Sequence, residues 1–201
     1  MRLKQIMISG LTLLIAITGF SQDLKVGKAA PDFSLKDPGG KEHKLQEYRG
    51  KYVVLEWVNY DCPFVKKHYN SGNMQALQST YTGLDVVWLS INSSAPGKQG
   101  NFTPDEILSR AKEHGAAFSA YLIDADGQVG HSYGAKTTPH MFIIDPQGVL
   151  VYAGGIDNIR STKVEDISRA KNFVSIALDE ALAGQPISNS ISKPYGCSVK
   201  Y

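Results

Sequence analysis

The chain has 201 residues, of which 42% are hydrophobic and 20% charged, so its composition is that of an ordinary globular domain and excludes a disordered chain or a fibre. The 21 lysines and arginines nearly balance the 19 aspartates and glutamates, which leaves a formal net charge of +2. That excess is too small for the basic surface of a nucleic-acid-binding protein.

The first 21 residues have the pattern of a secretory signal peptide. Arg2 and Lys4 precede an uncharged apolar stretch, residues 6–20, and a small residue at Ser21 favours cleavage after it. The stretch is shorter than the roughly 20 residues of a spanning helix, and an uncleaved anchor is the alternative. We therefore expect an exported protein, periplasmic or extracellular, with a single domain over residues 22–201.

The first half of that domain alternates strand and helix patterns. A glycine-rich turn at residues 37–40 separates two short expected strands. Runs of β-branched and aromatic residues at 51–58 and 85–91 predict strands that are buried on both faces. Between them, Pro63 favours the first position of a helix, which we expect to run in two pieces towards the second of these strands.

The second half adds helices and a hairpin to the expected sheet. The capping box at residues 103–106 predicts a helix over 104–114, and a short strand is expected at 120–123. Residues 140–154 predict a β-hairpin, and the apolar spacing over 164–182 predicts one helix. This order of elements predicts an α/β fold, a three-layer α/β/α sandwich with a mixed central sheet.

Cys62 lies at the expected turn from strand to helix. A helix N-terminus has unpaired N–H groups and a partial positive charge, and both favour a thiolate over a thiol. Lys66 follows one helical turn later, whereas the neighbouring Asp61 opposes ionisation. We expect a reachable thiol with a lowered pKa, and an inert buried thiol is the alternative.

Thr138 and Pro139 directly precede the expected strand at 140–144. Proline has no N–H and fits the first residue of a strand or a tight turn, where its peptide bond is a candidate for the cis form. Together with the strand, turn and helix at 54–66, residues 133–139 resemble the thioredoxin-like superfamily. The resemblance is to its redoxin or peroxiredoxin-like branch, with a single active-site cysteine in place of CxxC.

This resemblance implies a thioredoxin-like fold in which the proline loop faces the attacking thiolate of Cys62. It implies a thiol oxidoreductase with Pro139 shaping the substrate groove and Thr138 offering backbone hydrogen bonds to an extended substrate. Val65 stands at the second CxxC position, which is also the peroxidatic position of peroxiredoxins, so no local disulfide forms. Asn59 replaces the threonine of the peroxidase motif, which favours thiol–disulfide exchange over peroxidase activity.

The other cysteine of the chain is Cys197, in a C-terminal tail where Pro194 and Gly196 favour a flexible, exposed segment. A mobile tail supplies an accessible partner sulfur, so we expect Cys197 to resolve a mixed disulfide on Cys62. A static disulfide closing the long intervening loop, a bridge between chains, and a free thiol are the alternatives.

A binding module without turnover is the second functional hypothesis. His68 and His140, with the two cysteines, have the chemistry of a soft copper site, but the close ligand pairs of tight sites are absent. We therefore expect no metal and no other cofactor. The expected partners are a thiol or disulfide substrate protein or a small oxidant, and an external thiol reductant, with no nucleic acid and no stable membrane insertion. A scaffold without activity is a third, weaker hypothesis.

Overall fold

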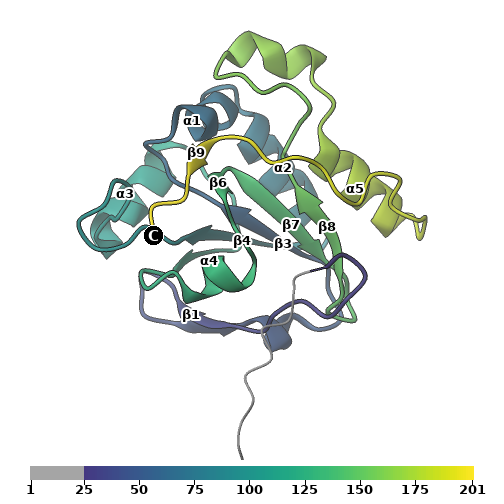
Figure 1. Ribbon diagram of the computed structural model, residues 1–201, viewed down its shortest axis with the longest axis horizontal. Helices are drawn as coiled ribbons and strands as arrows, with labels where there is room; N and C mark the ends of the chain where they lie inside the picture. Colours follow the sequence, from purple (N-terminus) through teal and green to yellow (C-terminus); the bar gives the residue numbers. More distant parts are fainter. Residues whose placement is uncertain (1–24) are drawn as a thin grey trace, which may run out of the picture.

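The computed structural model describes residues 25–201, and the expected signal peptide lies outside the described residues (Figure 1). Seven strands form the main sheet in the order β2-β1-β5-β4-β3-β7-β8. The central pairs β3–β4 and β4–β5 are parallel and the outer pairs are antiparallel, so the sheet is mixed, as expected. The strands are β1 (Ser34–Lys36), β2 (Glu42–Lys44), β3 (Val53–Trp57), β4 (Val87–Asn92), β5 (Ala120–Ile123), β7 (His140–Ile144) and β8 (Leu150–Gly154).

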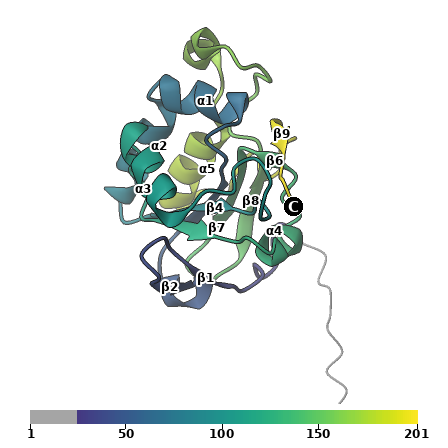
Figure 2. The ribbon, with the colours of Figure 1, turned by 90° about the vertical axis from the view of Figure 1, so that its left-hand side faces the viewer.

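Helices cover both faces of this sheet. Most of them lie on one side, and α4 lies on the other (Figure 2). The helices are η1 (Leu45–Tyr48), α1 (Pro63–Asn70), α2 (Asn73–Thr82), α3 (Pro104–Glu113), α4 (Gln128–Ser132), η2 (Val164–Arg169) and α5 (Phe173–Leu182). The expected three-layer α/β/α architecture is confirmed.

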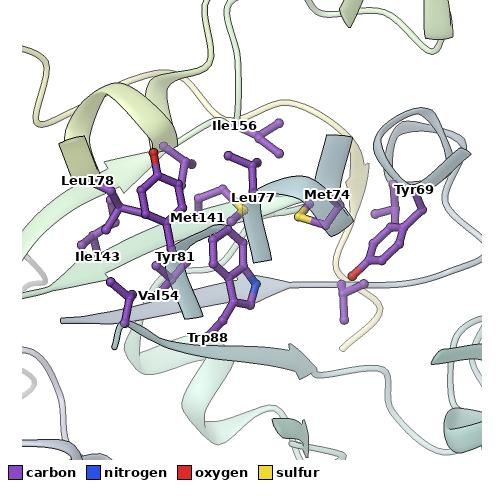
Figure 3. Close-up of a cluster of buried hydrophobic side chains, with 14 of the residues drawn as sticks. Val54, Tyr69, Met74, Leu77, Tyr81, Trp88, Met141, Ile143, Ile156 and Leu178 are labelled. Carbon is purple, nitrogen blue, oxygen red and sulfur yellow. The ribbon is translucent and has the colours of Figure 1, made fainter. Parts of the chain in front are cut away.

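The larger of two apolar clusters lies between the sheet and helices α1, α2 and α5 (Figure 3). Trp88 from β4 is fully buried there, next to Met74 and Leu77 from α2. Trp57 from β3 points to the opposite face and packs against Phe142 of β7. Side chains of a strand alternate between faces, so the uninterrupted apolar runs of β3 and β4 feed both clusters.

Two sequence-based expectations about helices are wrong. The helix expected over 164–182 is two elements, η2 and α5, because the Asn172 side chain accepts hydrogen bonds from the N–H groups of Val174 and Ser175 and so begins a new helix. Helix α4 was not expected, since its five residues are too few for a periodic pattern.

The C-terminal tail does not have the exposed, flexible form expected from its sequence. After α5 it crosses the molecule and ends in β9 (Cys197–Ser198), which pairs antiparallel with β6 (Thr137–Thr138) in a separate small sheet (Figures 1 and 2). Thr138 is the register partner of Cys197. Within residues 25–201, no helix combines the length and the apolar character needed to cross a membrane.

Candidate active site

A tight turn after β3 places Cys62 at the start of α1. The Asn59 side chain accepts a hydrogen bond from the Asp61 N–H at 2.9 Å, and the Asn59 carbonyl accepts one from the Cys62 N–H at 2.9 Å. Pro63 occupies the first helical position, so Cys62 is the N-cap residue with extended backbone angles. The cysteine position is therefore set by residues that are its close neighbours in sequence.

The proline loop faces this turn because β7 begins beside the end of β3, with His140 opposite Trp57. The Thr138–Pro139 peptide bond is cis, as the sequence predicts. The Cys62 thiol donates a hydrogen bond to the Thr138 carbonyl, with 3.1 Å between sulfur and oxygen. The structure thus brings Cys62 to the loop that the resemblance to the thioredoxin-like superfamily implied.

Cys197 reaches the same position from the other end of the chain. The pairing of β6 with β9 places it opposite Thr138, and its side chain packs against the apolar cluster that contains Cys62. Both cysteines are free thiols in this structure. The four residues expected at the site, Cys62, Thr138, Pro139 and Cys197, are therefore adjacent.

The two sulfurs have opposite pKa shifts. Burial raises the pKa of Cys62, but interactions with the Cys197 thiol and with the backbone N–H groups of Cys197 and Val65 outweigh it, so the pKa is lowered. The pKa of Cys197 is raised to about 11 by burial and by its hydrogen bond and charge interaction with Cys62. Ionisation therefore starts at Cys62.

The two charged neighbours expected to act on Cys62 have other roles. The Asp61 carboxylate accepts a hydrogen bond from the Arg110 guanidinium of α3 at 2.9 Å, so its charge has a partner. Lys66 lies on the exposed side of α1. The main causes that lower the pKa of Cys62 are hydrogen bonds rather than the charge of Lys66.

The expectation that the Cys62 sulfur is reachable is wrong while the tail is docked, since Cys62 is 0% exposed. Tyr195 and Cys197 from the tail belong to the apolar cluster that surrounds it, and the Phe64 ring packs edge-on against the Tyr195 ring at 5.8 Å. The tail thus forms part of the cover over the thiol. A substrate sulfur can reach Cys62 only after the tail has moved.

A buried ionic cluster that the sequence analysis missed lies beside the tail. The Lys67 ammonium donates to the Asp157 carboxylate at 3.0 Å and is 3.3 Å from the Tyr195 hydroxyl oxygen. Lys67 and Asp157 are 1% and 3% exposed. The sequence carried no clear signal for it, because Lys67 lies two residues from both Val65 and Tyr69, and side chains two residues apart do not share a helix face.

A second missed group is Glu56, in the middle of the apolar strand β3. Its carboxylate is fully buried and accepts hydrogen bonds from Trp88, Ser90, Gln78 and Tyr69. Burial, only partly offset by these bonds, raises its pKa. A single acidic residue in an otherwise apolar strand was the signal that marks it as a buried, hydrogen-bonded group.

The copper hypothesis has little support in the geometry. Among residues 25–201 no three histidine, cysteine or acidic side chains gather in a way that could hold a metal ion. His68 is engaged by Asn73 and Tyr195, and His140 accepts a hydrogen bond from the Lys136 N–H. The two histidines and two cysteines therefore form separate interactions rather than one ligand set.

Comparison with known proteins places these observations in a family. The AhpC/TSA family model matches residues 26–153. Thiol-disulfide oxidoreductase ResA from Geobacillus thermodenitrificans (strain NG80-2) is 31% identical over 147 residues, which cover 69% of this chain and 79% of that protein. Peroxiredoxin-2 from Macaca fascicularis is 30% identical over 148 residues, which cover 65% of this chain and 69% of that protein.

The solved structures agree with the sequence relatives. A hypothetical protein from Sinorhizobium meliloti 1021 superimposes with a TM-score of 0.75 at 26% identity, covering 90% of this chain and 96% of that one. The fold expected from the sequence is thus confirmed. The named relatives also confirm the expected enzyme class, a thiol oxidoreductase, and the ResA matches favour thiol–disulfide exchange. The chain belongs to the AhpC/TSA family.

Proposed function

We propose that this protein is an exported thiol–disulfide oxidoreductase in which Cys62 is the attacking thiolate and Cys197 the resolving cysteine. The observation that carries the proposal is the meeting of the two cysteines at Thr138, beside the cis Thr138–Pro139 bond: the Cys62 thiol donates to the Thr138 carbonyl, and Cys197 is the register partner of Thr138. The pKa of Cys62 is lowered and that of Cys197 is raised. This arrangement makes Cys62 easier to ionise than Cys197.

The first step is attack of the Cys62 thiolate on a substrate disulfide. A bond forms between the Cys62 sulfur and one substrate sulfur, while the other substrate sulfur leaves with the electron pair and takes up a proton. A thiolate is the required nucleophile, and the Val65 N–H at the start of α1 still stabilises it after the tail has moved.

The second step is attack by Cys197 on the mixed disulfide. Once Cys62 is in a disulfide it carries no charge, so two of the causes that raise the pKa of Cys197, the hydrogen bond and the charge of Cys62, are removed. Cys197 then ionises more readily and attacks the Cys62 sulfur, which releases the second substrate thiol. The substrate disulfide has gained two electrons, and the protein holds a Cys62–Cys197 disulfide that an external thiol reduces.

Thr138 and Pro139 line the groove in which a substrate binds. The Thr138 carbonyl lies 3.1 Å from the Cys62 sulfur, and its strand β6 is the edge along which β9 pairs. A substrate segment in extended form fits the same edge once the tail has left it. The partners of the reaction are accordingly a disulfide-containing polypeptide and a thiol reductant.

A peroxidase reaction is less well supported. Asn59 carries no hydroxyl, and its side chain is held by the turn before Cys62 and by the Gln99 carbonyl at 3.3 Å. No threonine therefore occupies the position that orients a peroxide in the peroxidase motif.

Export is supported by the signal-peptide pattern of the first 21 residues.

The proposal is tested by mixing the reduced, desalted protein with excess oxidised glutathione and measuring the mass of the product. We expect the wild-type chain to end with an internal Cys62–Cys197 disulfide. The Cys197→Ser variant should stop with glutathione attached to Cys62, because no second thiol can displace it. Ser198→Ala, a change in the same strand, is the matched control and should behave as the wild type.

Other products would decide against the proposal. A Cys197→Ser protein that carries no adduct on Cys62 would show that this thiol does not attack disulfides. A wild-type protein that accumulates a Cys62 adduct without closing the internal disulfide would remove the resolving role of Cys197. A disulfide that resists dithiothreitol would indicate a static link, and a covalent dimer would indicate pairing between chains.

A further inference from the structure

The Tyr195 side chain, two residues before Cys197, is the part of the tail that is bound most firmly to the body of the protein. It is 4% exposed, and its ring packs against Phe64 of α1 and under the Lys67 ammonium, 5.5 Å from the ring centroid. Its hydroxyl donates to the Asp157 carboxylate at 2.5 Å. A tail residue therefore enters a site formed by buried charged groups of the body.

The hydrogen-bonding capacity of the buried lysine is completed by the tail. The Lys67 ammonium has three protons, and its three oxygen partners are Asp157 at 3.0 Å, the Ile159 carbonyl at 2.9 Å and the Tyr195 hydroxyl at 3.3 Å. His68, next on the helix, also contacts the Tyr195 hydroxyl at 3.3 Å. Unpaired buried polar groups are costly, so these partners favour a docked tyrosine.

Gly196, between Tyr195 and Cys197, lies directly against the proline loop. A Cβ atom built on Gly196 would be 2.1 Å from the Thr138 carbonyl oxygen and 2.7 Å from its carbon, far inside van der Waals contact. The Gly196 φ of +144° is also one that residues with a side chain rarely adopt. The docked tail therefore depends on glycine at this position, and the neighbouring cysteine is brought beside Cys62 as a result.

We propose that Lys67, Asp157 and Tyr195 form a latch that seats Cys197 over Cys62, and that opening of this latch is the step that admits a substrate. The inference rests on the proposed function. Tyr195 and its two partners act as positioning residues, because they touch neither sulfur and act through the placement of the tail. Lys67 and Cys62 lie on the same short helix, so the latch is fixed rigidly relative to the attacking thiol.

The latch has two effects on the reaction. While it is closed, Cys62 has no exposed surface, so the rate of attack on any partner scales with the fraction of molecules in which the tail is open. After a mixed disulfide has formed, closing of the latch returns Cys197 to the Cys62 sulfur at high effective concentration. One set of contacts therefore sets both access to Cys62 and the rate of resolution.

The test compares Tyr195→Phe with a matched control, Tyr52→Phe, whose hydroxyl donates to the Ala181 carbonyl away from the tail. Both are made in the Cys197→Ser chain, which leaves Cys62 as its cysteine, and the rate of alkylation by iodoacetamide is measured across pH. Gly196→Ala in the same chain, which forces the tail off Thr138, gives the rate for the open state.

We expect Tyr195→Phe to raise the plateau alkylation rate at high pH by about tenfold or more, since hydrogen bonds to charged groups are lost. The midpoint of its profile should move to higher pH, because the released tail no longer donates its backbone N–H to the Cys62 thiolate. Gly196→Ala should show both changes at least as strongly, and Tyr52→Phe should show neither. Tyr52→Phe loses a comparable hydroxyl contact, so changes that appear in both variants would reflect a loosened fold rather than the latch.

With Cys197 restored, the same Tyr195→Phe change should lower the equilibrium constant for forming the Cys62–Cys197 disulfide from oxidised glutathione by a similar factor. Equal plateau rates for Tyr195→Phe and Tyr52→Phe would overturn the latch while leaving the proposed function intact. Unchanged alkylation in Gly196→Ala would show that the tail is not the cover, and would overturn it too. A Cys62 that stays unreactive in every variant would instead refute the proposed function.

Discussion

The two cysteines reach the same residue, Thr138, by different routes. The Cys62 backbone is held by a turn of four residues and by the first turn of α1, through hydrogen bonds within residues 59–66. Cys197 comes from the end of the chain and is held by a two-residue strand and by the Tyr195 side chain.

The two regions also differ in how they are stabilised. Cys62 is held by the packed body of the main sheet and its helices, which we call the frame. It belongs to the apolar cluster between the sheet and α1, α2 and α5 (Figure 3). The tail that carries Cys197 adds one buried aromatic ring, Tyr195, to this cluster, and is otherwise fixed by hydrogen bonds, among them those of Tyr195 with Lys67 and Asp157. Apolar burial on this scale is lost only on unfolding, whereas a few hydrogen bonds open locally. One sulfur is therefore a fixed part of the fold, and the other can leave and return.

The largest effect is expected from breaking the buried ion pair of Lys67 and Asp157. This pair belongs to the frame, although it also binds the tail. Lys67→Met leaves the Asp157 carboxylate buried without its cation, and we expect a loss of about 3–5 kcal/mol in the free energy of unfolding, measured with urea. Lys66→Met on the exposed side of the same helix is the matched control and should change it by less than about 0.5 kcal/mol. Equal effects of the two changes would mean that the pair contributes nothing to the frame.

Acid should weaken the frame through its buried histidines. Burial, more than nearby charge, lowers the pKa of His68 and of His140 to about 4, from 6.5 in the unfolded chain. Between these values the unfolded chain binds more protons, so the free energy of unfolding falls as pH falls from 6.5 to 4, by on the order of 3 kcal/mol per histidine.

The measurement is urea unfolding at several pH values. His140→Asn should flatten the fall between pH 6.5 and 4, because one of the two buried imidazoles is gone. The same change at the exposed His131 is the control and should keep the wild-type slope. A wild-type stability that stays constant across this interval would contradict the assignment of neutral, buried histidines to the frame.

The smallest effect is expected at the capping box of α3, which lies outside both cysteine regions. Thr103→Ala removes the hydroxyl that accepts from the Glu106 N–H, and should cost about 1 kcal/mol of stability. Thr103→Ser keeps the hydroxyl and should cost much less. Neither change should alter the pH profile of Cys62 alkylation. A shift of that profile would show that the surroundings of Cys62 depend on the start of α3.

Local elements of this protein could be predicted from the sequence because their causes are local. Pro63 after a strand, the capping box at residues 103–106 and the Thr138–Pro139 bond before β7 all lie where the sequence predicts them. The helix expected over 164–182 failed at a local feature too, since Asn172 is a good N-cap residue inside an apolar period.

Some features of the candidate site follow from neighbouring residues in the sequence, and others depend on the tertiary structure. The strand, turn and helix that present Cys62 were determined by neighbouring residues, so the sequence by itself was enough to single out this thiol. Tertiary structure alone decided that Cys197 lies beside it, that Cys62 is buried, and that Lys67 and Asp157 meet Tyr195. Contacts between residues far apart in the chain depend on how layers pack, and packing leaves no periodic pattern in any one segment.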